Sequence, residues 1–311
     1  MSFFQPQVIE RFSLVAVLGL RFRDVVTGAI IGDRLRVTAY PQGQPQRSVR
    51  AVPNRSGVYV LNSAPGLTMY ARGQGAAEFG DASPPQKNFT VEVLDEERRF
   101  QPFQIIVPIR PEQGLFKWPT SFDASPSLLA ESVPLYSSPT RTVPGGMSVI
   151  RAELWDRVAN QPASWAVLEA RLNNLLLARG IADGEGKIAL IFPNPAPQSA
   201  PFSSPPVIGG AALTEQVWEI ALRARYAPPL APASPPQPAS DAPALPDLRD
   251  TLMQPIATLW ADAEGVEELT EVSLRYGEEL VLRSRAAHTV SPPSPPSPPT
   301  RSSALLVSPA V

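Results

Sequence analysis

A diverged internal repeat constrains the fold of this chain more than any other sequence feature. The first copy runs from Arg21 to Gly66, and the second from Glu153 to Pro197, about 130 residues later. In each copy an aromatic residue and an aspartate lead into a turn-prone stretch. An alternating apolar run, a glycine-centred turn, a short strand and a proline follow. A repeat of strand, turn and strand without catalytic residues predicts a scaffold rather than an enzyme.

The defining residues keep the same order in both copies. The aromatic and acidic pairs are Phe22 with Asp24 and Trp155 with Asp156; the alternating runs are Leu35, Val37, Ala39 and Trp165, Val167, Glu169; the turns are Asn54–Gly57 and Asp183–Gly186. Alternation with a period of two indicates a half-buried strand. Each copy should therefore build its own apolar core, with Trp155 and Trp165 inside the second.

Short strands at a spacing of roughly ten residues predict a mainly β fold with two sandwich-like domains. Strands are expected at 12–18, 34–40, 47–52, 58–61, 89–95, 100–109, 149–155, 187–192 and 305–307, with a closing hairpin of 267–276 and 279–285 around Gly277. Segments 165–177 and 214–226 fit either a helix or a strand. The repeat favours a strand for the first, and the apolar run Val217–Leu222, which is typical of β-sandwiches, favours a strand for the second. The strand 89–95 is a candidate edge for pairing with a neighbouring subunit.

One short helix is expected between Asp247 and Trp260. Leu248, Leu252, Ile256 and Leu259 have helical spacing, and Asp247 is a suitable N-cap residue. Pro255 predicts a kink or break, because it lacks the backbone N–H of a helix interior.

Proline punctuates the chain and suggests its domain boundaries. The 38 prolines are more than twice the number expected at the average usage of about 5%. We expect a first sandwich at 1–110, a Pro- and aromatic-rich connector at 111–147, and a second sandwich at 148–311 with Pro-rich insertions at 193–206, 228–246 and 291–299. Polyproline has no internal hydrogen bonds, so the last two insertions are expected to be spacers outside the cores.

Composition excludes several classes of function. The chain has no cysteine, which excludes disulfide scaffolds and thiolate metal sites. A net charge of −2 gives no basic surplus for nucleic acid. The apolar run 12–20 is far shorter than the ~20 residues of a membrane span and follows no basic segment. We therefore expect a cytoplasmic protein without a membrane-spanning segment.

Four features of the sequence could carry chemistry, but none of them predicts a catalytic or binding site. His288 is the single histidine and lies beside a polyproline tract. Asp183–Gly186 resembles part of a calcium loop but lacks the further ligands, so a hairpin turn is favoured. Asp95–Arg99 is interpreted as a solvated hairpin tip. The five tryptophans, Trp118, Trp155, Trp165, Trp218 and Trp260, could line a sugar platform, although core packing is favoured. No catalytic, cofactor or metal site is expected.

The first repeat resembles a known family. Asp24–Gly28 reads DVVTG, Leu35–Ala39 alternates, and Ser56–Leu61 reads SGVYVL before the turn at Ala64–Gly66. These motifs resemble the carboxypeptidase regulatory-like, transthyretin-type β-sandwich, which implies a transthyretin- or Ig-like fold and a non-catalytic interaction module. The second copy keeps the aspartate and the glycine turn but lacks the Thr-Gly pair and the tyrosine.

A second resemblance suggests a function. Val91–Asp95 followed by Arg99-Phe100, the segment from Pro139 to Gly146, and the closing Gly277–Ser284 are similar to proteins encoded with bacterial phage-tail-like contractile injection systems. This implies a structural or assembly component of such a particle, at its cap or baseplate, whose partners are other protein subunits or further copies of itself. The alternative is a carbohydrate- or surface-binding accessory module.

Overall fold

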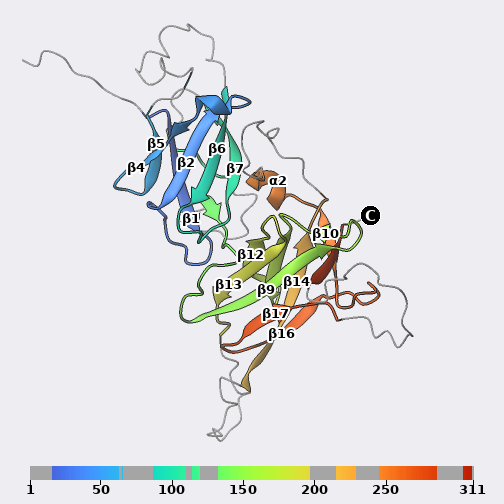
Figure 1. Cartoon of the computed structure of the whole chain (residues 1–311). Coiled ribbons are helices and arrows are strands. Elements are labelled where there is room, and N and C mark those ends of the chain that lie inside the picture. Colours follow the sequence, from blue (N-terminus) through green and yellow to red (C-terminus); the bar gives the residue numbers. More distant parts are fainter. Residues whose placement is uncertain are drawn as a thin grey trace, which may run out of the picture.

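The computed structural model describes residues 16–62, 65, 87–109, 114–119, 132–196, 215–228, 245–285 and 304–309. Within them the regular secondary structure is almost entirely β-strand, with one α-helix and one 3-10 helix. No helix in these residues has the length and apolar character that a membrane crossing requires. The strands form two sandwich-like bodies, one mostly blue to cyan and one mostly green to red in Figure 1. The predicted mainly β, sandwich-like fold class is thus confirmed.

The first sandwich consists of two four-stranded sheets. One has the order β3 (Val49–Arg50), β2 (Leu35–Pro41), β6 (Lys87–Asp95), β7 (Phe103–Ile109); the other has the order β4 (Val52–Pro53), β5 (Val58–Leu61), β1 (Leu18–Asp24), β8 (Val133–Leu135). All neighbours are antiparallel except β1 and β8, which run parallel. Of the strand expected at 12–18, residues 12–15 lie outside the described residues, and the observed strand starts at Leu18.

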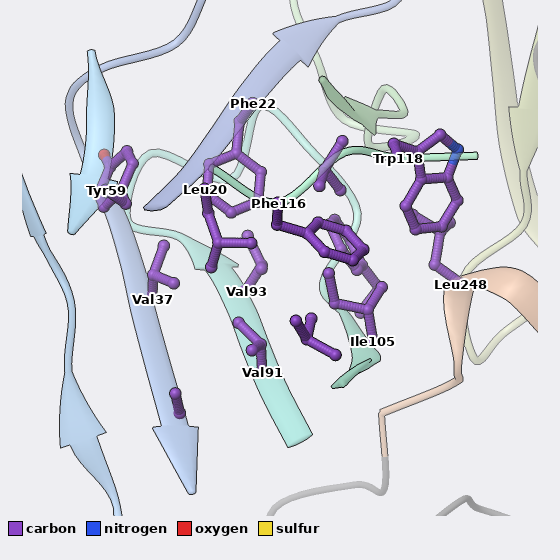
Figure 2. Close-up of a cluster of buried hydrophobic side chains, with 14 of the residues drawn as sticks. Leu20, Phe22, Val37, Tyr59, Val91, Val93, Ile105, Phe116, Trp118 and Leu248 are labelled. Atoms are coloured by element: carbon purple, nitrogen blue, oxygen red, sulfur yellow. The ribbon is translucent and has the colours of Figure 1, made fainter. Parts of the chain in front are cut away.

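The core of the first sandwich comes from alternate residues of facing strands. Figure 2 shows Leu20 and Phe22 of one sheet close to Val37 and Val93 of the other, with Trp118 and Leu248 at one end. The rings of Phe22 and Tyr59 meet edge to face, with centroids 5.4 Å apart. The Leu35 amide donates a hydrogen bond to the Tyr59 hydroxyl, so this buried polar group is satisfied.

The second sandwich is one hydrogen-bonded sheet of ten strands that folds around a separate core. The main path is β10 (Gln161–Pro162), β9 (Met147–Asp156), β18 (Leu305–Ser308), β15 (Ile256–Trp260), β14 (Val217–Arg225), β11 (Val167–Leu172), β12 (Leu175–Ile181). Off this path, β13 (Lys187–Pro193) and β17 (Glu279–Leu282) pair with β9, and β16 (Glu271–Arg275) pairs with β14.

The two sandwiches share one pairing pattern, which gives the sequence repeat a structural meaning. In the first, β1 pairs antiparallel with β5 and β2 with β6; in the second, β9 pairs antiparallel with β13 and β11 with β14. A short strand from much later in the chain then joins each in parallel: β8 beside β1, and β18 beside β9. Both parallel pairings end beside a buried aspartate, Asp24 or Asp156.

The helix is shorter than its apolar spacing predicts. Helix α2 covers only Leu248–Leu252, and the Asp247 carboxylate caps it by accepting hydrogen bonds from the amides of Arg249 and Asp250. The expected N-cap is confirmed, but Ile256 and Leu259 belong to strand β15. Pro255 lies between the two elements and cannot supply the donor that a continued helix requires.

The prediction of a closing hairpin around Gly277 is wrong. Gly277 does form a turn, with φ of 73°, but β16 pairs with β14 while β17 pairs in parallel with β9. The turn at Gly277 therefore connects two strands, β16 and β17, that pair with different strands of the sheet and not with each other. Along one side of β9, β17 lies beside Val149–Ala152 and β18 continues beside Leu154–Asp156.

Segment 165–177 forms strands, as the repeat favours, but as two strands and with a different inward face. β11 and β12 make a hairpin whose turn residues, Asn173 and Asn174, both have positive φ. In β11, Leu168 and Ala170 lie in the second core, whereas Val167 packs in the first core and Glu169 lies on the same side of the strand as Val167. The expected pairing edge at Phe89–Asp95 is also wrong, because β6 is a central strand between β2 and β7.

Part of the expected connector belongs to the first sandwich. Within 111–147, β8 pairs with β1, and Phe116, Trp118 and Tyr136 pack in the first core. The three Pro-rich insertions fall almost wholly outside the described residues.

The ends of the last insertion are joined within the second sandwich. The Ser284 amide donates to the Ala304 carbonyl at 3.1 Å, and the Leu306 amide donates to the Ser284 hydroxyl. We expect deletion of Pro292 to Pro299 to change the melting temperature by less than about 3 °C, because halving a closed loop alters its entropy by only ~0.6 kcal/mol. Differential scanning calorimetry of the full chain measures this. A loss above 10 °C would show that the tract stabilises the fold.

Candidate functional site: the junction between the sandwiches

A buried aspartate ends β1 and organises the junction. The two Asp24 oxygens accept hydrogen bonds from the Val26 amide at 3.0 Å and the Thr27 hydroxyl at 2.7 Å. The guanidinium of Arg141 adds a bidentate contact at 2.9 and 2.7 Å. Burial alone would raise the pKa of Asp24, but the hydrogen bonds from Arg141, Thr27 and Val26 outweigh it and leave the pKa lowered. Asp24 is therefore held as a carboxylate.

The corresponding aspartate of the second sandwich has a different partner. Asp156 accepts hydrogen bonds from the amides of Val158 and Ala159, as Asp24 does from its own turn. Its other oxygen accepts a hydrogen bond from the Tyr226 hydroxyl at 3.0 Å. Burial and this contact raise the pKa of Tyr226. Both aspartates thus cap a turn at a strand end, which is a structural role.

Arg141 also joins the connector (111–147) to both sandwiches. Its guanidinium lies 5.0 Å from the centre of the Phe100 ring, and the Arg99 guanidinium lies 5.2 Å from the same centre. From the second sandwich, Arg151 donates to the Pro139 and Arg141 carbonyls. The two motifs at Val91–Phe100 and Pro139–Gly146 therefore meet at one place, although they are far apart in sequence.

A second buried charge cluster lies on the face of β11 and β12 that meets the first sandwich. Glu169 is 1% exposed and contacts the guanidinium groups of Arg171 at 2.9 Å and Arg179 at 2.8 Å. Burial would raise the pKa of Glu169, but these two arginines outweigh it and lower the pKa. Arg179 in turn hydrogen-bonds Tyr136 of the first sandwich.

Apolar contacts close the same interface. Val167 and Ile181 of the second sandwich, with Leu248 and Leu252 of α2, pack in the first core cluster. The Gln101 side chain donates to the Ile181 carbonyl at 3.3 Å. A small cavity beside Tyr136 and Thr251 has room for about one water molecule, which is too little for an organic substrate. The interface thus holds the two sandwiches together and offers no ligand pocket at this point.

Within the described residues, the side chains that the sequence suggests as candidate sites stabilise turns and ion pairs. The Asp183 carboxylate accepts from the amides of Glu185 and Lys187, and Asn54 makes the same contacts in the first repeat, so Asp183–Gly186 is a hairpin turn. At the tip Asp95–Arg99, Asp95 binds the Arg99 guanidinium at 3.0 Å. His288 lies outside the described residues. No group of three or more His, Asp or Glu side chains in the described part could hold a metal ion.

The tryptophans do not all pack as expected. Trp118 and Trp218 are buried in the first and second cores. Trp165 packs against the first core cluster and has a φ of 63°, and Trp155 lies partly exposed on the outer face, so the expectation that both fill the second core is wrong. Trp155 points outward because its neighbours Leu154 and Asp156 point inward.

No protein-family model and no curated protein matches this chain. The roles of its motifs are therefore inferred from their contacts.

Proposed function

We propose that this chain is a non-catalytic structural component of a contractile, phage-tail-like injection particle, placed at its cap or baseplate. The observation that carries the proposal is the convergence of the motifs similar to such components on the junction between the sandwiches. Phe100 of one motif stacks with Arg141 of another, and Arg141 binds the buried Asp24. Arg151 of the second sandwich donates to the Arg141 carbonyl, so these contacts link the two sandwiches, as expected of a subunit under mechanical load.

The buried charges support the same proposal. Perturbed carboxylates often mark catalytic sites, but structural ion-pair networks also perturb pKa values. Here Asp24 and Glu169 are fully engaged by arginines, and Asp156 by its turn amides and Tyr226. A carboxylate occupied in this way is poorly placed to transfer a proton to a substrate.

Affinity purification of the tagged full-length chain from native lysate, followed by electron microscopy, tests this function. Sheath and tube subunits are expected to co-purify, and a gold label on the tag should mark one end of each particle. The untagged strain is the control for adventitious capture. Particles that assemble normally after deletion of the gene, and that never carry the label, would overturn the proposal.

A further inference from the structure

Two tryptophans lie in one row on the outer face of the second sandwich. The strand register places Leu306 of β18 directly between Trp155 of β9 and Trp260 of β15, and places Pro162 of β10 next to Trp155. Directly paired residues project to the same face of a sheet. These four residues, here called the tryptophan row, are all partly exposed, while the alternating Leu305 and Val307 are buried in the core.

The indoles of the row are fixed by polar contacts at their edges. The Trp155 Nε1 donates to the Asn160 side chain at 3.1 Å, and the Trp260 Nε1 donates to the Ser308 hydroxyl at 2.9 Å. A ligand therefore has no indole N–H left to bind and must be recognised through the ring faces. Side chains held in place before binding lose little conformational entropy when a ligand arrives.

The equivalent positions of the first sandwich are buried, so exposure of this face is not a general property of the shared pairing pattern. Through the shared pairing pattern, Trp155 and Leu306 correspond to Arg23 and Pro134, which are paired across β1 and β8. Both residues of the first row are buried. In the second sandwich the same positions carry Trp155 and Leu306, large aromatic and aliphatic groups that stay partly exposed.

We propose that the tryptophan row is a binding platform for a linear β-1,4-linked glycan, with sugar rings stacked on Trp155 and Trp260. The two tryptophans are separated by two strand spacings, about 10 Å. In an extended β-1,4-linked chain, alternate sugars present the same face at a comparable separation. The apolar C–H face of a pyranose fits an indole ring face, and a straight row suits an extended chain better than a compact ligand.

Polar groups at the rim suit the hydroxyls of such a chain. The guanidinium of Arg157, an exposed residue, lies over the Trp260 ring at 5.8 Å from its centre and donates one hydrogen bond to the Glu264 carbonyl, so it borders the ring on which a sugar would stack. Glu268 is bridged to Trp260 at the other side of the row and is exposed. The platform therefore combines apolar ring faces with a donor and an acceptor at its margin. This site does not depend on the particle role proposed above, since either can fail while the other holds.

Titration of the full-length chain with cellohexaose and with chitohexaose, followed by tryptophan fluorescence and isothermal calorimetry, tests the platform. Binding of at least one of them is expected, and Trp155→Ala or Trp260→Ala should weaken it about tenfold or more, because each removes one stacking surface. Trp155→Tyr keeps an aromatic ring and should retain most of the affinity. Leu175→Ala, at a 72% exposed apolar residue of the β11–β12 hairpin, is the matched control and should bind as the parent does.

Melting temperatures of all variants are compared so that a folding defect is not taken for lost affinity. Failure of both hexasaccharides to bind at millimolar concentration would overturn the proposal. So would glycan binding that survives in the Trp155→Ala, Trp260→Ala double variant. A synthetic SPPSPPSPP peptide forms the third arm, because aromatic surfaces also bind polyproline segments. Binding of that peptide without binding of either glycan would assign the row to proline-rich sequences instead.

Discussion

Replacing Leu305 by aspartate is expected to unfold the second sandwich, whereas the same change at Leu306 leaves it folded. Leu305 is 0% exposed and packs in the second core, so Leu305→Asp removes apolar contacts and places an unpaired carboxylate there. A buried, unpaired charge together with the lost leucine should cost about 4 kcal/mol or more. Leu306 is on the outer face, where an aspartate stays hydrated and should cost about 1 kcal/mol.

Calorimetric unfolding at neutral pH measures both variants. Leu305→Asp should lower the melting temperature by more than 10 °C or abolish the transition of the second sandwich, since each kcal/mol corresponds to roughly 2–4 °C in a domain of this size. Leu305→Met is the matched control: it conserves volume and should cost less than about 1.5 kcal/mol. Equal losses at positions 305 and 306 would contradict the inward and outward alternation of β18.

The strands were predictable because alternating and β-branched patterns are local. The strands 34–40, 58–61, 89–95, 149–155 and 187–192 all occur close to their predicted limits. The order of the repeat also carried over, since Asn54 and Asp183 make the same turn contacts. Pairing partners were harder to predict. The alternating pattern of 89–95 suits an edge strand and a central strand equally well. It therefore did not indicate that β6 pairs with a strand on each side, β2 and β7.

The second repeat shows why the inward face could be misassigned. In the first copy Leu35, Val37 and Ala39 face the core, and the alignment gave that role to Trp165, Val167 and Glu169. Both faces of β11 are covered, one by its own core and the other by the first sandwich, so apolar residues occur on each. A one-residue change of register exchanges the two faces. Periodicity alone cannot choose between them when both are buried.

The junction and the tryptophan row were not predictable from local patterns. Arg141 reaches Asp24 across 117 residues of sequence, and the segment that carries Arg141 reads as an irregular proline-rich connector. The parallel strands β8 and β18 are three and four residues long and lie far from their partners in the sequence. Because β18 lies between Trp155 and Trp260, the row exists only once that pairing is known. From the sequence alone, core packing was the favoured interpretation for both Trp155 and Trp260, although the structure places them on the outer face.

Replacing Arg141 by methionine is expected to lower the free energy of unfolding by about 3–5 kcal/mol at neutral pH. The Asp24 side chain is 3% exposed and its partner 10%, so the substitution leaves a charged carboxylate buried without its guanidinium. Arg285→Met is the matched control, because the Arg285–Glu267 pair is 69% and 62% exposed and should be worth less than about 1 kcal/mol. Urea unfolding of the full chain measures both.

The pH dependence separates a charge effect from a packing effect at Arg141. In the parent the pKa of Asp24 is lowered on folding, so the stabilisation is complete above the unfolded value of about 3.9 and is lost as the pH falls through the folded pKa. In Arg141→Met, Asp24 loses the hydrogen bonds and the charge of Arg141 that lower its pKa, so this pKa rises relative to the parent and the variant loses less stability than the parent as the pH falls and Asp24 takes up a proton. The difference between the two proteins should therefore be largest near pH 7 and narrow towards pH 4.

Adding Asp24→Asn to Arg141→Met completes the test, because the amide is neutral at every pH. The double variant should recover part of the loss at pH 7, and its stability difference from the single variant should vanish at low pH, where Asp24 is protonated. A deficit of Arg141→Met that is constant from pH 4 to 7 and is unchanged by Asp24→Asn would show that arginine acts through the packing of its side chain on Phe100 instead.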